Sequence, residues 1–248
     1  MIPKILQKKN AQGILYIVST PIGNLEDITL RALRILKEVD LICAEDTRKT
    51  RILLHHFHIN TPVTSFYDHN ERYKTPLIIQ KLKAGQNIAL VSEAGTPTIS
   101  DPGYRIINSA IQQAIRVVPV PGPTAVIAAL SIAGLPVHRF AFEGFLPSKP
   151  GKRKNFLRKI SNEERTIIFY ESPHRIVKTI RDLIESFGND RSATICRELT
   201  KVYEERISGP LSVLLAIIEK NPLKGEITLV VEGKKAQNDT LIDTTYSS

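Results

Sequence analysis

Cysteine is scarce in this 248-residue chain, which has only two, Cys43 and Cys196. They stand far apart in apolar runs, so the sequence contains no disulfide framework and no cysteine spacing typical of a zinc site. We expect two buried, reduced thiols. The N-terminal residues lack the apolar stretch and the small-residue cleavage site of a secretory signal peptide, and we therefore expect a cytoplasmic protein.

Long uncharged runs are also rare, and only residues 117–137 are long enough to suggest a membrane span. Pro119, Pro121, Gly122 and Pro123 break the first third of this run. The uninterrupted part, 124–133, would be a helix of about 15 Å, against a hydrocarbon core of about 30 Å. We therefore predict a buried turn followed by a buried helix, and no membrane partner.

Several catalytic and binding motifs are missing. The 13 glycines include no G-x-G pair, which excludes the dinucleotide fingerprint and the usual Gly-rich loop of Rossmann-type methyltransferases. There is no G-x-S-x-G nucleophile elbow. His55, His56 and His58 have no nearby Asp, Glu or Cys to complete a metal site, so we interpret them as a solvated helix end and expect no metal.

The composition is that of a globular protein with a cationic surface. Hydrophobic residues make up 42% and charged residues 24%, which excludes disorder of the whole chain. Lys and Arg number 34 against 25 Asp and Glu, for a net charge of +9. This excess favours an anionic partner, such as nucleic acid, a phosphorylated ligand or an acidic membrane surface.

Apolar strand-like runs alternate with segments of helical periodicity along the chain. Strands are predicted at 14–19, 41–44, 63–66, 87–92 and 116–120, with helices at 29–37, 47–58, 72–84 and 104–114 between them. This alternation predicts an α/β domain with a mostly parallel sheet. The pattern then restarts, with strands at 139–143, 166–170, 192–196 and 225–231 and helices at 124–133, 152–160, 174–186 and 211–219. We expect domains at 13–122 and 123–233, with flexible ends at 1–12 and 234–248.

Three segments rich in Gly and Pro each follow a predicted strand. They are STPIGNLED (19–27), SEAGTPTISDPG (92–103) and PVPGPTA (119–125). Ligands of open α/β sheets bind beyond the carboxyl ends of the strands, and glycine lets the backbone approach a ligand closely. Three such loops at one sheet edge predict a pocket for a small ligand bound largely through backbone groups.

Charged residues gather in two further segments. Glu45 and Asp46 follow the predicted strand 41–44, and Arg48, Lys49 and Arg51 follow them on a helix. The second segment contains the cations Lys149, Lys152, Arg153, Lys154, Arg158 and Lys159, with no acid between residues 144 and 162. The first segment is also consistent with a capped, solvated helix, but an acid-free run favours phosphate contacts. We find no helix-turn-helix or zinc-finger signature, so RNA or a phosphorylated ligand fits better than DNA.

Together these segments resemble a known family. TPIGNLEDITLRAL, AEDTRKT, SEAGTPTISDPG, VPVPGPTA, FYESPHR and the run CRELTK, in this order, are similar to the ribosomal RNA small subunit methyltransferase I family, a tetrapyrrole methylase-like group of class III methyltransferases. The resemblance extends from about Ile14 to Val231. It implies two α/β domains with S-adenosylmethionine (SAM) in a cleft between them, a homodimer, and 2′-O-methylation of cytidine 1402 in the decoding region of 16S rRNA.

The resemblance also implies which residues bind the cofactor. The stretch that would lie along the amino-acid and ribose portions of SAM includes Ala94, Gly95, Thr96 and Ile99. Further contacts would come from Ile22, Thr124 and Ala125, and from Tyr170 and Leu199 on the adenine side. This chain departs from the family at Glu93, where Asp is usual.

Methyl transfer to a ribose hydroxyl also requires that a proton be removed. The resemblance makes Asp46 the first candidate for the general base, and Glu45 is the second. The cations Arg48 and Lys49 would lower the pKa of Asp46, so orientation alone, with the proton lost to water, is a rival mechanism. RNA phosphates would be held by Arg48, Lys49, Arg51, Lys149, Lys152, Arg153, Lys154 and Arg158.

Two other functions remain open from the sequence. The same fold and SAM loops would serve a methyltransferase acting on a tetrapyrrole, although the basic run and the TPIGNLED loop argue against it. A non-catalytic RNA-binding module with a vestigial SAM pocket is the other alternative.

Overall fold

A computed structural model describes residues 12–235, which divide into two compact units at Thr124 and Ala125. The ends that we expected to be flexible, 1–12 and 234–248, lie outside the described residues except for residue 12 and for Lys234 and Lys235. Lys234 is held in place, since its backbone N–H donates to Glu163 O at 2.7 Å. Among residues 12–235, every helix is too short or too polar to cross a membrane.

The first unit is a parallel five-stranded sheet. Its elements in chain order are β1 (Leu15–Val18), the 3-10 helix η1 (Leu25–Asp27), α1 (Leu30–Glu38), β2 (Leu41–Ala44), α2 (Thr47–His56), β3 (Val63–Ser65), α3 (Asp68–Lys83), β4 (Ile88–Val91), α4 (Tyr104–Gln112) and β5 (Val117–Val120). The strand order is β3-β2-β4-β1-β5, and every pair is parallel. The predicted parallel sheet is confirmed here.

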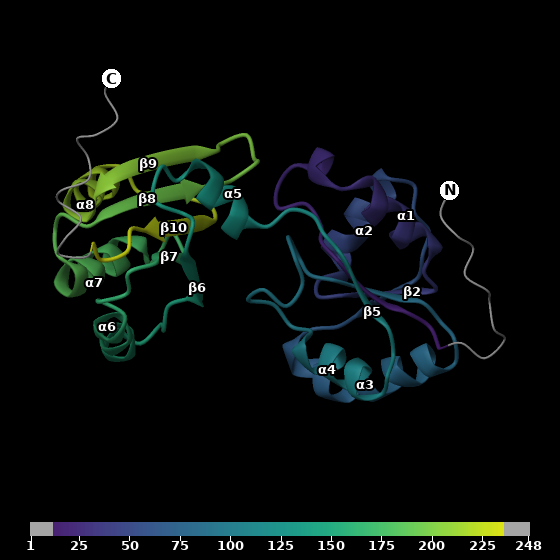
Figure 1. Cartoon of the computed structure of the whole chain (residues 1–248). Coiled ribbons are helices and arrows are strands. Elements are labelled where there is room, and N and C mark those ends of the chain that lie inside the picture. Colours follow the sequence, from purple (N-terminus) through teal and green to yellow (C-terminus); the bar gives the residue numbers. More distant parts are fainter. Residues whose placement is uncertain (1–11, 236–248) are drawn as a thin grey trace, which may run out of the picture. The chain divides into compact units, whose positions relative to one another are not determined.

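Helices cover both faces of this sheet (Figure 1). Alternate residues of β2 and β4 face opposite ways, so Ile42 and Ala89 join a core with α1 and α2. Cys43 and Leu90 join a second core with α3 and α4. Burial on both faces explains why these strands read as continuous apolar runs.

The second unit contains a mixed sheet. Its elements are α5 (Ala125–Ile132), β6 (Phe140–Phe145), α6 (Pro150–Lys159), β7 (Thr166–Glu171), α7 (Ile176–Phe187), β8 (Ser192–Arg197), β9 (Glu205–Pro210), α8 (Leu211–Lys220) and β10 (Ile227–Val231). The order is β6-β7-β10-β8-β9, and only β6 and β7 pair in parallel. The core on one face joins α6, α7 and α8 to β7, β8 and β10. On the other face, Thr194 Oγ1 donates to Ala133 O just after α5.

Two elements differ from the sequence-based expectation. Strand β9 was not predicted, because its residues ERISGP are mostly polar and exposed, as an edge strand allows. Helix α3 begins at Asp68, four residues before the predicted start. The side chain of Asn70 accepts from the backbone N–H of Tyr67 at 2.9 Å and so caps a polar first turn that has no apolar periodicity.

The apolar run at 117–137 forms β5, a Pro-rich turn and α5, so the predicted turn and helix are present. Their predicted burial is only partial, because Pro119 and Pro121 are exposed and only Val126, Ala129 and Leu130 of α5 are buried. Both cysteines are buried free thiols, also as predicted. Burial raises the pKa of Cys43 to about 12 and that of Cys196 to about 11, so neither thiol is activated as a nucleophile.

Candidate functional site

The parallel order of the first sheet brings the carboxyl ends of all five strands to one edge. The three segments rich in Gly and Pro are the connections that follow β1, β4 and β5, so the prediction that they share this edge is confirmed. Glu45 and Asp46 follow β2 at the same edge. The candidate site is therefore built from loops that a rigid sheet holds in place.

Hydrogen bonds tie these three loops to one another. Thr20 and Gly95 form an isolated antiparallel bridge, with N–H to O distances of 2.9 and 3.0 Å. Thr96 Oγ1 donates to Pro123 O at 3.3 Å and lies 2.9 Å from Ser19 Oγ. A hydroxyl has one hydrogen and a carbonyl only accepts, so Ser19 donates to Thr96 in this chain of bonds. Thr96 thus connects all three loops.

Glycine is required at two points where the loops approach closely. Gly95 has φ +82°, and a Cβ there would lie 3.3 Å from Ile22 Cγ2. A Cβ on Gly122 would lie 2.9 Å from the Cβ of Ser19. Thr98 and Ser100 adopt φ values of +75° and +65°, which is costly for residues with a Cβ. Strain of this kind concentrates at ligand-binding loops.

The structure brings together most of the expected cofactor residues of the first unit. Ile22 is buried against Gly95, and Ala94 and Thr96 flank that glycine. Thr124 follows Pro123, the acceptor of the Thr96 hydroxyl, and Ala125 begins α5. Ile99 extends into solvent, with 41% of its surface exposed.

Ala125 opens the second unit, which also contains the two remaining expected contacts, Tyr170 and Leu199. Tyr170 packs edge-on against Phe142, with ring centroids 4.9 Å apart. Leu199 is buried between Glu198 and Thr200, which have φ values of +50° and +68°. Left-handed backbone on both sides of Leu199 is costly for residues that carry a Cβ.

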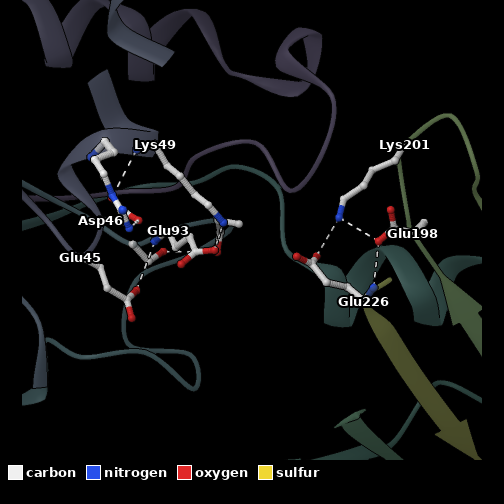
Figure 2. Close-up of polar contacts among 10 residues, drawn as sticks. Glu45, Asp46, Lys49, Glu93, Glu198, Lys201 and Glu226 are labelled. Atoms are coloured by element: carbon white, nitrogen blue, oxygen red, sulfur yellow. Dashed lines mark hydrogen bonds and ion pairs between the residues drawn. The ribbon is translucent and has the colours of Figure 1, made fainter. Parts of the chain in front are cut away.

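Glu198 holds this turn through its carboxylate. Its Oε1 atom accepts from Lys201 Nζ at 3.0 Å and from the backbone N–H of Glu226 at 2.8 Å. Lys201 also pairs with the Glu226 carboxylate at 3.1 Å, as Figure 2 shows. Gly225 is required beside them, because a Cβ there would lie 2.4 Å from Glu198 Oε1. Lys201, the lysine of the CRELTK run, therefore has a structural role.

The carboxylates at the sheet edge have very different environments. Asp46 is the N-cap of α2 and accepts from the backbone N–H of Arg48 at 2.8 Å and from its guanidinium at 3.0 Å. These bonds lower the pKa of Asp46 to about 2. Glu45 Oε2 accepts from the backbone N–H of Glu93 at 3.2 Å, and burial raises the pKa of Glu45. The structure thus favours Glu45 over Asp46 as a proton acceptor.

Sequence reasoning missed a third carboxylate, Asp101, in the loop after β4. Burial and the nearby charges of Glu45 and Glu93 raise the pKa of Asp101 to about 6. Its place in the SDPG end of a loop already assigned to ligand binding was the available signal. A carboxyl with a pKa near neutrality is suited to accept a proton at physiological pH.

Glu93 reaches across to α2. Its carboxylate forms an ion pair with the ammonium group of Lys49, and Figure 2 shows the two side chains pointing toward each other. Glu93 stands where the family usually has Asp, and its side chain, longer by one methylene, makes this contact.

The basic run on α6 is less available than its sequence indicates. Arg153 is only 3% exposed, and its Nε atom donates to Asp182 of α7 at 2.7 Å. The expectation that Arg153 contacts RNA is therefore corrected. Lys154 and Arg158 both pair with Glu185 of α7. The exposed cations Lys149 and Lys152 form no ion pair within residues 12–235.

Comparison with known proteins identifies the family. Residues 14–214 match the model of the Tetrapyrrole (Corrin/Porphyrin) Methylases. The chain belongs to this family. The predicted family, the α/β fold class and the enzyme class, a methyltransferase, are thereby confirmed.

Two curated relatives illustrate the similarity. The protein named ribosomal RNA small subunit methyltransferase I of Escherichia coli O157:H7 is 53% identical over 234 residues, which cover 94% of this chain and 82% of the relative. The protein of the same name from Synechocystis is 52% identical over 221 residues, which cover 89% and 79%.

Solved structures share the fold at low sequence identity. The cobalamin biosynthetic enzyme cobalt precorrin-4 methyltransferase has a TM-score of 0.67 and 16% identity, over 88% of this chain and 94% of the other. Uroporphyrin-III C-methyl transferase from Thermus thermophilus complexed with S-adenyl homocysteine has a TM-score of 0.64 and 19% identity, over 89% and 97%. The tetrapyrrole methylase architecture therefore persists where the sequence has diverged.

Proposed function

We propose that this chain is a SAM-dependent ribosomal RNA methyltransferase of the small subunit, which methylates the ribose 2′-oxygen of cytidine 1402 in 16S rRNA. The observation that carries the proposal is its identity of 53% with a relative named for this class of substrate, over 94% of the chain. The loops joined at the sheet edge support a cofactor site there.

The residues at this edge fit SAM. Ile22, Ala94, Gly95 and Thr96 lie together at this edge, and Gly95, which has no Cβ, lets the backbone approach a ligand closely. We place Ile99, Thr124 and Ala125 in the same set, and the family resemblance adds Tyr170 and Leu199 to it. When bound, SAM supplies a methyl group activated by a sulfonium centre. No metal takes part in this proposal.

The chain itself orients the acceptor and removes its proton. The ribose 2′-oxygen must lie about 3–3.5 Å from the methyl carbon, in line with the bond that breaks. Among the edge carboxylates, Asp101 and its neighbour Glu45 have raised pKa values. Asp101 accepts the hydroxyl proton as the oxygen–carbon bond forms, and Glu45 is the second candidate for this role. Asp46 caps α2 in this scheme and is not the base.

RNA phosphates are bound by exposed cations of both units. Arg51 and the first-turn residue Arg48 present positive charge beside the sheet edge, and Lys149 and Lys152 present it at the start of α6. Lys49, the other cation expected to bind phosphates here, is paired with Glu93 instead. Single-stranded RNA with an unstacked target base is the form that such a site receives. Lys154 and Arg158 contribute to the field around α6, although Glu185 offsets part of their charge.

A homodimer and a cytoplasmic location complete the proposal, and both rest on the family resemblance. Sedimentation of the purified protein tests the first, because a dimer has twice the 27.7 kDa mass of the chain.

The decisive experiment is methyl transfer from labelled SAM to small ribosomal subunits that lack the modification, with the product nucleotide mapped. Label on the 2′-oxygen of cytidine 1402 supports the proposal. Label on a tetrapyrrole acceptor and none on RNA would establish a small-molecule methyltransferase. RNA binding without any transfer, together with absent SAM binding in calorimetry, would establish the non-catalytic module.

A further inference from the structure

A cavity of about 190 Å³ opens beside the cofactor loops, within the first unit. It lies between the loop after β1, the outer face of α2 and the end of β4. The residues that line it are Thr20, Pro21, Leu25, Lys49, Thr50, Ile52, Leu53, Ser92 and Glu93. None of them belongs to the expected cofactor set, but Pro21 precedes Ile22 and Glu93 precedes Ala94. The cavity is therefore an unassigned space that borders the cofactor site.

The walls and the rim of this cavity differ in chemistry. Pro21, Leu25, Ile52 and Leu53 form an apolar wall, although α2 is otherwise a basic helix. The rim carries the exposed ion pair of Lys49 and Glu93, and the hydroxyl groups of Thr20, Thr50 and Ser92 are buried. A flat ligand with apolar faces and a polar edge matches this division.

An unsatisfied hydroxyl independently indicates a missing partner. Thr20 is 4% exposed, and its Oγ1 atom has no hydrogen-bond partner among the described residues. Buried hydroxyls are almost always bonded, so a group without a partner beside a cavity points to a ligand.

The ion pair at the rim is accessible and held in place. The side chains of Lys49 and Glu93 are 55% and 45% exposed to solvent. Glu45 anchors the backbone of Glu93 through the 3.2 Å hydrogen bond, and Lys49 lies in the first turn of α2, which Asp46 caps. The pair thus presents one acceptor and one donor side by side at fixed positions.

We propose that this cavity receives the base of the target nucleotide and that Glu93 and Lys49 select cytosine over uracil. This inference rests on the proposed function. Cytosine has an amino donor at N4 and acceptors at N3 and O2, so Glu93 accepts from N4 and Lys49 donates to the ring acceptors. Uracil has a carbonyl oxygen in place of the amino group. This acceptor would face the Glu93 carboxylate, which is unfavourable because neither group can donate a hydrogen bond. A cavity below the range of about 300–1,000 Å³ typical of drug-sized ligands is suited to a single base.

The test compares otherwise identical small subunits with C or U at the target position. The wild type, Glu93→Gln, Glu93→Asp and Lys49→Met are assayed for the ratio of kcat/KM on C to that on U, and for SAM affinity by calorimetry. We expect Glu93→Gln to reduce the ratio by about 5- to 150-fold, because a good base contact is worth about 1–3 kcal/mol of discrimination. Glu93→Asp should retain part of the ratio, and SAM affinity should stay within about twofold. Lys83→Met, an exposed cation of α3, is the matched control.

Two results of this assay would overturn the inference. An unchanged C to U ratio in Glu93→Gln and Lys49→Met excludes base selection at this pair. A loss of SAM affinity equal to the loss of activity assigns the pair to the cofactor instead. A wild type that transfers no methyl group to RNA refutes the proposed function. In that case the base preference is tested by binding alone, with short single-stranded RNAs that carry C or U and fluorescence anisotropy as the measurement. Equal affinities for the two RNAs would refute the inference.

Discussion

Arg153 of α6 donates from Nε to Asp182 of α7 at 2.7 Å, and both side chains are almost completely buried. The pair connects the two helices below the exposed face of α6. An arginine in the middle of a basic run is therefore part of the core of the second unit, and its charge is not available to RNA.

Replacing Arg153 with Ala should destabilise the second unit. Asp182 would remain buried, with only Lys154 at 3.8 Å to offset its charge. Loss of one partner from a buried pair costs about 3–5 kcal/mol. Urea denaturation checks this, with Lys152→Ala as the exposed control, which should change the free energy of unfolding by less than about 0.5 kcal/mol. Equal stability of the two variants would contradict the structural role of Arg153.

The double variant Lys149→Ala and Lys152→Ala should weaken RNA binding without altering SAM affinity. Each cation that contacts a phosphate of single-stranded RNA contributes about 0.7 to the slope of log affinity against log salt, so the slope should become less steep by about 1.4. A salt titration of RNA binding measures it. Lys178→Ala on the exposed surface of α7 is the control. A slope equal to that of the wild type would remove α6 from the RNA interface.

The methylation rate should rise with pH through about 6 as Asp101 loses its proton, and Asp101→Asn should remove this limb. The pKa of Asp101 is higher in the folded protein than in the unfolded chain, so the free energy of unfolding should fall as pH rises from about 4 to about 6. Asp101→Asn should remove this fall also. Rate profiles under saturating SAM and RNA, together with denaturation at each pH, check both effects. A limb that persists in Asp101→Asn would return the base role to Glu45.

Asp46→Asn should keep the methylation rate, whereas Asp46→Ala should lower the melting temperature. Asn caps a helix about as well as Asp, but Ala leaves the first N–H groups of α2 without an acceptor. The pKa of about 2 implies that the cap's charge stabilises the fold above about pH 4 and is lost as pH falls toward 2. If Asp46→Asn abolishes methylation while the variant stays as stable as the wild type, Asp46 is the base.

Gly95→Ala should weaken SAM binding by about tenfold or more. Alanine at φ +82° is strained by more than about 1 kcal/mol, and its Cβ presses on Ile22. Calorimetry with SAM measures the change. The matched control is Gly151→Ala in α6, where no atom lies within 4 Å of the added Cβ. Unaltered affinity in Gly95→Ala would place the cofactor elsewhere.

The sequence predicts the first unit well because its strands are short apolar runs, each followed by a distinct loop. Strand β4 and its Gly-rich loop could be located from residues 87–103 alone. The parallel order then follows from the intervening helices, and with it the shared edge.

The second unit was harder to predict. Strand β9 carries no apolar run, and the position of β10 between β7 and β8 has no local signal. The partner of Arg153 lies 29 residues away, so the burial of this cation depends on packing that no motif encodes. Asp101 was overlooked because its raised pKa depends on residues from other loops.

The strand order of the first unit has a consequence for synthesis of the chain. Strand β1 emerges from the ribosome before the other strands, yet its neighbours in the sheet are β4 and β5, which end at residues 91 and 120. Strand β1 therefore gains its first neighbour only after residue 91 has been made and its second only after residue 120. Until β4 has been made, Leu15 and Val18, both fully buried in the finished protein, have no native strand beside them. The N-terminal unit is thus a late-closing nascent chain, exposed to chaperones for most of its own translation.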